Sequence, residues 1–486
     1  MKLADLLEGI EVVEVAADMN MEIGDISYDS RNVKPGDLFV AIAGFESDGY
    51  AYIGSAVENG AVAVVCERAP NLEIPYIIVK NSRSALAFAS SNYFGKPAEK
   101  MKILGVTGTN GKTTSTMLIK HMIEMCEKSK VGLVGTNQNM IGYKVLPTER
   151  TTPESYDLQK LFKEMADEGC KYVVMEVSSH SLTLDRVGGI HFEVGLFTNL
   201  TQDHLDFHDS MDDYARAKAM LFTRCNKGAV NIDDDYAAMM IDNATCPVLT
   251  FAVEKDEAEL VGKDTKLLPT AVKFCALSTN ILERVVLNIP GKFSVYNALG
   301  VIAVGLQLGY SMADCAAALK TAKGVMGRVE VVTTDGDYTI LIDYAHTPDA
   351  LENVLLSMKE VAEGRVVALF GCGGDRDRTK RPIMGKIAAQ CADFVIVTSD
   401  NPRTEEPDAI IADIAAGLEG MKTPQKVISD RREAIAWAID HHKPKDIIVL
   451  AGKGHETYQI IGKTKHHMDE REIVAEHLEK RKNRKP

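Results

Sequence analysis

The stretch that decides the fold runs Gly105-Val106-Thr107-Gly108-Thr109-Asn110-Gly111-Lys112-Thr113-Thr114. A short apolar run at 103–106 leads into it and predicts a buried strand, and apolar residues recur after it at helical spacing. A strand, a glycine-rich turn and a helix together let backbone N–H groups and a helix N-terminus surround an anion. We therefore expect a phosphate-binding loop in which Lys112 reaches the phosphates and the Thr113 hydroxyl holds Mg²⁺.

The spacing of this loop leaves one alternative open. Five residues separate Gly105 from Gly111, one more than the strict phosphate-loop pattern allows. A glycine-rich turn that binds no ligand would also satisfy the pattern. The Gly-Lys-Thr sequence at the start of a helix favours the phosphate-binding interpretation.

Composition and charge narrow the class of protein. With 486 residues, 45% of them hydrophobic, the chain is long enough for about three domains with packed cores. The net charge of −14 argues against nucleic acid as a partner, because nucleic-acid binding needs a basic face. Nine cysteines without a C-x-x-C pair favour reduced thiols and a cytoplasmic location. No apolar stretch of about 18 residues is present, so we expect no membrane segment.

The pattern of strands and helices predicts an α/β fold with three domains. Residues 1–97 form a small α/β unit, in which the polar turn Asp29-Ser30-Arg31 is either a nucleotide-sugar contact or ordinary turn chemistry. Residues 98–326 alternate strands with helices, which predicts a mostly parallel sheet covered on both faces. Residues 327–486 repeat this alternation and predict a Rossmann-like domain.

Polar residues follow the central strands of the middle region. Glu176 ends one apolar strand and is a candidate Mg²⁺ ligand, although an ion pair at the sheet rim is the alternative. His204 follows a second strand and is either part of the same metal region or a structural histidine. Lys218 lies in a predicted helix between two alanines, and composition alone does not distinguish a functional lysine from a solvated one.

Four strands of the last region each lead into a polar or glycine-rich turn. Because the carboxyl ends of parallel strands share one edge of a sheet, these turns are expected to line one crevice. The turns are Asp343 to Pro348, Gly371 to Arg378, Asp400 to Arg403, and Gly452 to Glu456.

Taken in order, these motifs resemble those of the Mur ligases, the ATP-dependent amide-forming enzymes of peptidoglycan synthesis. The resemblance covers essentially the whole chain, and its signature Asp400-Asn-Pro-Arg403 is similar to that of the branch that adds meso-2,6-diaminopimelate. The matching motifs are Gly108 to Thr114, Glu176 to His180, Thr198 to His204, Tyr296 to Leu299, and Asp343 to His346.

The resemblance implies an ATP-dependent ligase with Mg²⁺ that joins meso-2,6-diaminopimelate to UDP-N-acetylmuramoyl-L-alanyl-D-glutamate through an acyl phosphate. It implies catalytic or metal-ligand roles for Lys112, Thr113, Glu176, His204 and Lys218, the last of which family members carbamylate. The implied ATP contacts are Gly108, Thr109, Asn110, Gly111, Lys112, Thr113, Thr114, Asn297, Arg328, Asp343 and His346. The implied UDP-muramyl-dipeptide contacts are Ser30, Thr151, Thr152, Ser179 and Arg186, and the diamino-acid contacts are Arg376, Asp400, Asn401, Pro402, Arg403, Gly452 and Glu456.

The chain departs from the family pattern at three positions. Arg150 stands where an Asn is common, Leu184 where some members have Gln, and Tyr50 where many have His. Three alternative functions remain open: an L-lysine-adding ligase, a folylpolyglutamate synthetase-like ligase, and a nucleotide-binding protein without catalysis. Residues 1–97 argue against the second, and the set Lys112, Glu176, His204 and Lys218 argues against the third. A monomer is expected.

Overall fold

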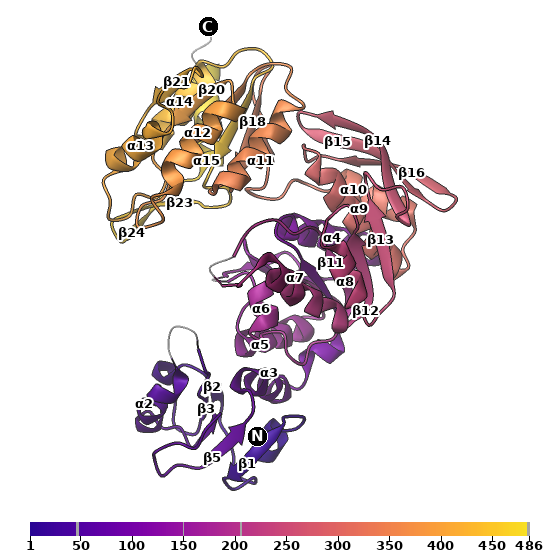
Figure 1. Ribbon diagram of the computed structural model, residues 1–486, viewed down its shortest axis with the longest axis vertical. Coiled ribbons are helices and arrows are strands. Elements are labelled where there is room, and N and C mark those ends of the chain that lie inside the picture. Colours follow the sequence, from indigo (N-terminus) through magenta and orange to yellow (C-terminus); the bar gives the residue numbers. More distant parts are fainter. Residues whose placement is uncertain (45–47, 149, 205–206, 484–486) are drawn as a thin grey trace. The chain divides into compact units, whose positions relative to one another are not determined.

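The computed structural model describes residues 1–44, 48–148, 150–204 and 207–483. The chain divides into two compact units, one of residues 1–261 with 299–315 and the other of residues 262–298 with 316–486. Both units are α/β, as the sequence predicts, and the elements are labelled along the chain in Figure 1.

The first unit begins with a five-stranded sheet in the order β1-β5-β4-β3-β2. All neighbouring pairs are parallel except β1 with β5. Side chains alternate between the two faces, so Leu38 and Val40 pack with helices α1 and α3 while Phe39 packs with α2. The strands are β1 (Val12–Ala16), β2 (Ile26–Ser27), β3 (Leu38–Val40), β4 (Ala63–Cys66) and β5 (Tyr76–Val79).

The second sheet of this unit carries the predicted phosphate loop at its centre. Strand β6 (Lys102–Thr107) lies between β10 (Tyr172–Glu176) and β11 (Phe192–Phe197), and all three are parallel. Strands β7 (Val131–Val134), β12 (Cys225–Asn231) and β13 (Val248–Ala252) extend it in parallel. The central strands are buried on both faces, which is why they read as continuous apolar runs.

The second unit holds a six-stranded sheet in the order β17-β18-β22-β19-β20-β21. Only β17 runs antiparallel to its neighbour, so the carboxyl ends of the other five strands share one edge. The strands are β17 (Glu330–Val332), β18 (Thr339–Asp343), β19 (Val366–Phe370), β20 (Phe394–Val397), β21 (Gln425–Val427) and β22 (Ile447–Ala451). Helices α14 and α15 cover the face that includes Ile342, Leu369 and Leu450.

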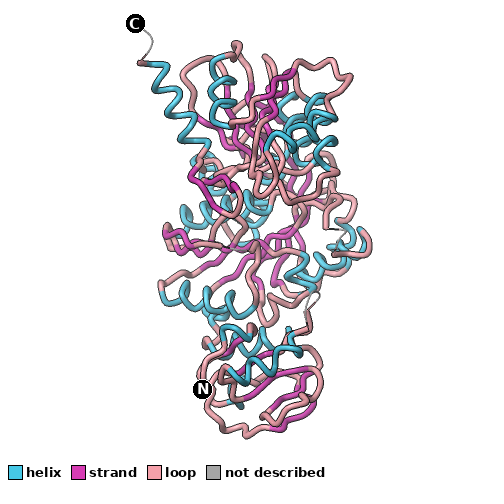
Figure 2. Tube along the Cα trace, turned by 90° about the vertical axis from the view of Figure 1, so that its left-hand side faces the viewer, coloured by secondary structure: helices cyan, strands magenta, loops and turns pink. Residues whose placement is uncertain are grey.

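Helices and strands alternate along most of the chain. Figure 2 shows the helices in cyan and the strands in magenta. In the first unit the helices are α1 (Leu3–Leu6), α2 (Ile53–Glu58), α3 (Ser82–Tyr93), α4 (Lys112–Glu127), α5 (Ser155–Asp167), α6 (Ser179–Thr183), α7 (Met211–Ala219) and α8 (Ala237–Asp242). Helices α9 (Phe293–Leu308) and α10 (Met312–Thr321) follow, and then α11 (Pro348–Lys359), α12 (Lys380–Cys391), α13 (Pro407–Ala416), α14 (Arg431–Asp440) and α15 (Glu470–Lys482). In the described part of the chain no helix is long and apolar enough to cross a membrane.

Several further strands were not predicted from the sequence. Three antiparallel pairs are β8 (Asn139–Ile141) with β9 (Lys144–Leu146), β15 (Ala271–Ser278) with β16 (Ile281–Leu287), and β23 (Tyr458–Ile461) with β24 (Thr464–His467), and β14 (Leu260–Leu268) runs parallel to β13. Strands β9, β16 and β24 are largely exposed, so no alternation between a buried and an exposed face marks them as strands.

The core between α5 and the central sheet yields a stability prediction. Phe162 is fully buried there beside Leu158 and Val173. We expect Phe162→Ala to lower the free energy of unfolding by about 3–5 kcal/mol, because it removes buried apolar area and leaves a cavity. Tyr143→Ala is the control, since that ring is 87% exposed, and we expect a change within ~0.5 kcal/mol. Urea unfolding measures both, and equal effects of the two substitutions would contradict the assigned core.

Candidate active site

The glycine-rich loop connects β6 to α4, as predicted, and its geometry requires glycine. Gly108 has φ +147°, and a Cβ there would lie 1.9 Å from Thr198 Oγ1. Gly111 precedes α4 with φ +85°. The end of the neighbouring strand β11 holds the loop, since Asn199 O accepts from Thr109 N at 2.8 Å and Asn199 Oδ1 accepts from Asn110 N at 2.9 Å. The loop is therefore fixed from one side while α4 begins at Lys112.

Two lysines from different helices converge on this loop. Lys112 Nζ donates to Gly108 O at 2.8 Å, and Lys218 Nζ on α7 donates to the same oxygen at 2.9 Å. Lys218 is almost completely buried, and its ammonium lies 4.5 Å from the centre of the Tyr214 ring. Burial lowers the pKa of Lys218 well below its usual value, and the charge of Lys112 lowers it further. A buried lysine with a depressed pKa has a larger share of neutral, nucleophilic amine.

Glu176 and His204 lie close to the loop on other elements. Glu176 ends β10 opposite Val106 of β6, and its two carboxylate oxygens accept from the backbone N and the hydroxyl of Thr136 at 2.9 and 3.0 Å. The His204 ring lies 4.9 Å from that of His180 and 6.0 Å from that of Tyr214. The described residues contain no group of three His, Cys, Asp or Glu side chains placed to hold a metal ion. The oxygen donors of Thr113 and Glu176 are nevertheless of the kind that Mg²⁺ prefers.

A cleft of about 820 Å³ lies in the first unit, with Ser30, Arg83, Arg150 and Glu154 among its lining residues. Glu154 is buried, and three arginines surround its carboxylate: Arg150 and Arg186 at 2.9 Å and Arg83 at 3.6 Å. Three cations thus face the Glu154 carboxylate, whereas the lining of the cleft as a whole balances three arginines, Arg31, Arg83 and Arg150, against three carboxylates, Asp29, Glu58 and Glu154. The sequence analysis missed Glu154 and Arg83, although an acidic residue with an arginine four positions earlier, Arg150, was a possible signal.

The other predicted muramyl contacts form hydrogen bonds near the end of β10. Thr152 Oγ1 donates to Glu176 O at 2.8 Å, and Thr151 Oγ1 lies 3.0 Å from Thr136 Oγ1. Ser179 Oγ is hydrogen-bonded to His208 Nε2 at 2.9 Å. Thr151, through Thr136, and Thr152 are thus connected to Glu176 at the carboxyl end of β10.

The remaining predicted ATP contacts belong to the second unit. Asp343 is buried at the end of β18 and accepts from the backbone N–H groups of Val329 and Ala345, both at 2.8 Å. Burial raises the pKa of Asp343. The Arg328 guanidinium lies 5.1 Å from the centre of the Tyr344 ring, and His346 Nδ1 is hydrogen-bonded to Tyr344 O at 2.7 Å. Asn297 is buried in α9.

The predicted diamino-acid residues gather at one edge of the second unit's sheet. Asn401 Nδ2 donates to Glu456 Oε2 at 2.9 Å, and a Cβ on Gly452 would lie 2.6 Å from Asp400 Oδ2. Arg403 has φ +52°, and its backbone N–H and C=O bond to residues Ile460 and Gly462 of the β23–β24 hairpin. The Asp400–Arg403 turn is thus held by both strand ends and the hairpin.

Lys453 is a residue of this cluster that sequence reasoning missed. Its ammonium is fully buried and donates to Asn401 Oδ1 and Glu456 Oε2, each at 3.0 Å, with Asp400 Oδ1 at 3.8 Å. No local signal marks it, because a lysine between two glycines, Gly452 and Gly454, has the sequence pattern of an exposed turn.

Comparison with known proteins assigns the fold to a class. Three family models match in order: "Mur ligase family, catalytic domain" at residues 22–103, "Mur ligase middle domain" at 106–305 and "Mur ligase, glutamate ligase domain" at 327–454. The chain belongs to the Mur ligase family and has its three-domain α/β fold.

Among its relatives are proteins named UDP-N-acetylmuramoyl-L-alanyl-D-glutamate–2,6-diaminopimelate ligase. That of Caldanaerobacter subterraneus subsp. tengcongensis is 49% identical over 98% of this chain and 99% of its own length. That of Clostridium botulinum is 48% identical over 94% of this chain and 95% of its own length. A solved structure of the same name has a TM-score of 0.75 and 30% identity, with 99% of each chain covered.

The close approach at Gly108 yields a prediction for nucleotide binding. We expect Gly108→Ala to weaken ATP binding at least ~10-fold, because the added Cβ displaces Thr198 and deforms the loop. Gly169→Ala is the matched control, since Gly169 also has a positive φ, +80°, but a Cβ added there would meet no atom of the described residues within 4 Å. Calorimetric titration with ATP measures both, and unchanged ATP affinity in Gly108→Ala would show that the loop does not bind the phosphates.

Proposed function

We propose that this chain catalyses the ATP-dependent addition of meso-2,6-diaminopimelate to UDP-N-acetylmuramoyl-L-alanyl-D-glutamate in peptidoglycan precursor synthesis. The observation that carries the proposal is the turn Asp400–Arg403, in which the Arg403 guanidinium donates to a backbone carbonyl, Gly374 O at 2.8 Å, and forms no ion pair with any described carboxylate. Such an arginine is suited to bind a substrate carboxylate. The names of the full-length relatives support the same substrate.

The proposed reaction has two steps. The γ-carboxylate of the D-glutamyl residue attacks the γ-phosphate of ATP, ADP leaves, and an acyl phosphate forms. The amine of the diamino acid then attacks the acyl carbon, phosphate leaves, and the amine loses a proton as the amide forms. The protein contributes mainly orientation and charge neutralisation, as in other phosphoryl transfers.

The residues at the edge of the central sheet would perform the first step. The N–H groups of the glycine-rich loop and the ammonium of Lys112 would bind the ATP phosphates, and Asn297, Arg328, Asp343 and His346 would contact the rest of the nucleotide. Thr113, Glu176, His204 and a carbamylated Lys218 would hold Mg²⁺, which neutralises phosphate charge when bound. Ser30, Thr151, Thr152, Ser179 and Arg186 would bind the UDP-muramyl dipeptide, to which we add Arg83 and Arg150 from the lining of the cleft.

Lys218 would act as a carbamate rather than as a cation. Its neutral amine adds to CO₂ and loses one proton, so a buried positive charge becomes a carboxylate-like anion. The depressed pKa and the neighbouring ammonium of Lys112 support this modification, because burial favours the neutral amine and the cation stabilises the product. The domain boundaries at 97/98 and 326/327, a monomeric state and a cytoplasmic location complete the proposal.

The alternative functions differ in what they require of the chain. A folylpolyglutamate synthetase-like activity does not need the region matched at residues 22–103 by a Mur ligase model. An L-lysine-adding ligase would need no partner for a second substrate carboxylate, so it leaves the position of Arg403 unexplained. A nucleotide-binding protein without catalysis would release no ADP when both other substrates are present.

The first prediction of this proposal concerns Lys218. We expect Lys218→Ala to lower kcat at least ~100-fold, because the site loses an anion that offsets the metal charge. Arg216→Ala on the same helix is the matched control, since that side chain is exposed, and it should keep normal turnover. ADP release at varied bicarbonate measures both, and crystallographic density at Lys218 tests for the carbamate. An active Lys218→Ala protein would refute this role.

The second prediction concerns the amino-acid substrate and tests the function itself. ADP release is measured with UDP-muramyl dipeptide and a panel of amino acids, and wild type should prefer meso-diaminopimelate over L-lysine. We expect Arg403→Ala to reduce that preference by about 30- to 1000-fold in kcat/KM, since it removes a charge-assisted pair with the distal carboxylate. Arg378→Ala, an exposed arginine nearby, should change the preference less than ~3-fold. Equal use of lysine by wild type would contradict the proposed function.

A further inference from the structure

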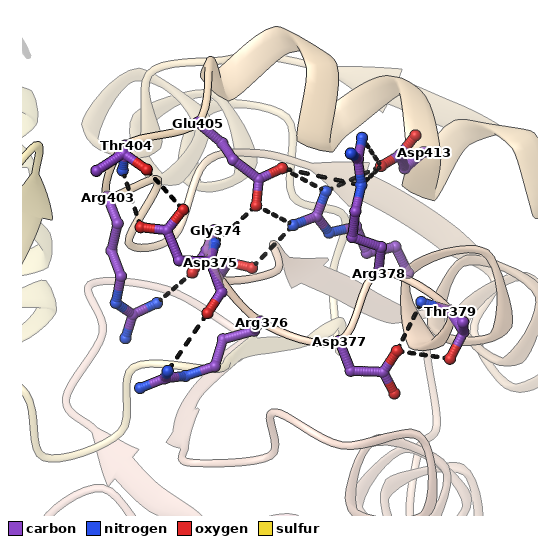
Figure 3. A network of polar contacts seen from close by, with 12 residues as sticks. Gly374, Asp375, Arg376, Asp377, Arg378, Thr379, Arg403, Thr404, Glu405 and Asp413 are labelled. Atoms are coloured by element: carbon purple, nitrogen blue, oxygen red, sulfur yellow. Dashed lines mark hydrogen bonds and ion pairs between the residues drawn. The ribbon is translucent and has the colours of Figure 1, made fainter.

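Four carboxylates surround the turns that carry Arg376 and Arg403, and each is bound by a donor other than these two arginines (Figure 3). The pairs are Asp375 with Thr404 Oγ1 at 2.7 Å, Asp377 with Thr379 Oγ1 at 2.6 Å, Glu405 with Arg381 Nη2 at 2.7 Å, and Asp413 with Arg381 Nη1 at 2.9 Å.

Arg376 and Arg403 have only backbone oxygens as hydrogen-bond acceptors among the described residues. Arg403 Nη1 donates to Gly374 O at 2.8 Å and Arg376 Nη1 to Asp375 O at 3.3 Å. Within the described ranges neither guanidinium forms an ion pair with a carboxylate. Each of them therefore keeps most of its N–H donors for a bound anion.

Glu405 is the acidic residue nearest to Arg403 in the chain, and the peptide group between Gly374 and Asp375 lies between their side chains. The carbonyl of Gly374 accepts from Arg403, while the N–H of the same peptide unit, at Asp375, donates to Glu405 Oε1 at 2.7 Å. In a trans peptide the C=O and N–H groups point in opposite directions. The two charged groups consequently lie on opposite sides of the Gly374–Asp375 peptide, as Figure 3 shows.

Arg381 at the start of α12 holds Glu405 in this place. Its side chain is fully buried, and it binds both carboxylate oxygens, with Nη2–Oε1 at 2.7 Å and Nη1–Oε2 at 2.9 Å. Such a two-point pair fixes orientation as well as distance. The Arg381 guanidinium lowers the pKa of Glu405 to about 2, so the carboxylate is an anion at neutral pH.

We propose that Arg381 is a positioning residue for the amino-acid substrate: by binding Glu405 it keeps that carboxylate from pairing with Arg403, which leaves Arg403 and Arg376 to bind the substrate carboxylates. This inference rests on the function proposed above. Without Arg381, Glu405 loses its two-point partner, and two other arginines remain for it: Arg378, whose Nε lies 4.0 Å from Glu405 Oε2, and Arg403, two residues earlier in the chain. Glu405 then competes with the diamino acid for Arg403.

The test compares Arg381→Met with the double variant Arg381→Met/Glu405→Gln. We expect Arg381→Met to raise KM for meso-diaminopimelate at least ~10-fold while KM for ATP stays within ~2-fold, because only the amino-acid site gains a competing anion. Removing that anion in the double variant should return KM for meso-diaminopimelate to within ~3-fold of wild type. If Arg381 had only a structural role, the second substitution in the same cluster would not restore KM for meso-diaminopimelate.

Asp413→Asn is the matched control, since it also removes a partner of Arg381 but leaves the Glu405 pair intact, and KM for meso-diaminopimelate should not change. Cooperative unfolding shows whether Arg381→Met is folded. If it is not, the same comparison is made between Arg381→Lys and Arg381→Lys/Glu405→Gln, because lysine cannot bind both carboxylate oxygens in a planar fork. An unchanged KM in the single variant, or no recovery in the double variant, overturns the inference. Failure of the wild-type protein to ligate meso-diaminopimelate would instead overturn the proposed function, before any variant is compared.

Discussion

The hydrogen bond from the buried ammonium of Lys218 to Gly108 O connects the main parts of the central site. It joins α7 to the glycine-rich loop across 110 residues of sequence, and it brings the lysine to the carbonyl that Lys112 also binds. Two ammonium groups so close together repel each other, and burial adds a further penalty for the charged form of Lys218. The site therefore favours the neutral amine of Lys218 over its ammonium.

In the second unit, too, buried cations bind groups of the turns that form the candidate site. Lys453 and Arg381 are fully buried, and Arg431 on α14 pairs with the buried Glu470 at 2.8 Å while donating to Ala451 O at the end of β22 at 2.8 Å. A buried charge is costly unless it is paired, so such residues do more for geometry than for net stability. Each of these three binds groups at or next to the carboxyl ends of strands, where the turns of the site begin. The common result is a set of turns whose shape is fixed by cations that the substrate need not touch.

This arrangement separates two kinds of arginine. Arg381 and Arg431 have carboxylate partners within the protein, whereas Arg376 and Arg403 have only backbone acceptors in the described part of the chain. Two carboxylates follow Arg403 closely in the chain, Glu405 and Glu406. Arg403 does not pair with the first, because both oxygens of Glu405 are bound by Arg381. A pairing with Glu406 is likewise not formed among the described residues.

Local patterns in the sequence were sufficient to predict the alternation of strands and helices and the position of the glycine-rich loop. Strand β19 ends at Phe370, directly before the predicted turn that starts at Gly371, because buried parallel strands are unbroken apolar runs in the sequence. The loop was predicted because its features are local: glycines at the positions with positive φ and the first residues of a helix follow one another in the sequence. The antiparallel strands β15 and β16 were missed, since β16 is largely exposed and the pairing of the two strands is set by neighbours in space.

The sequence by itself determined the fold class, the family resemblance and the residue types at the strand ends. The tertiary structure alone decided which partner each long charged side chain takes. Lys453, Glu154 and Arg381 look like ordinary surface residues in the sequence, yet all three are buried and bind groups that define the site. Their partners come from separate elements, and only the packed fold removes the water that would otherwise compete for these charges.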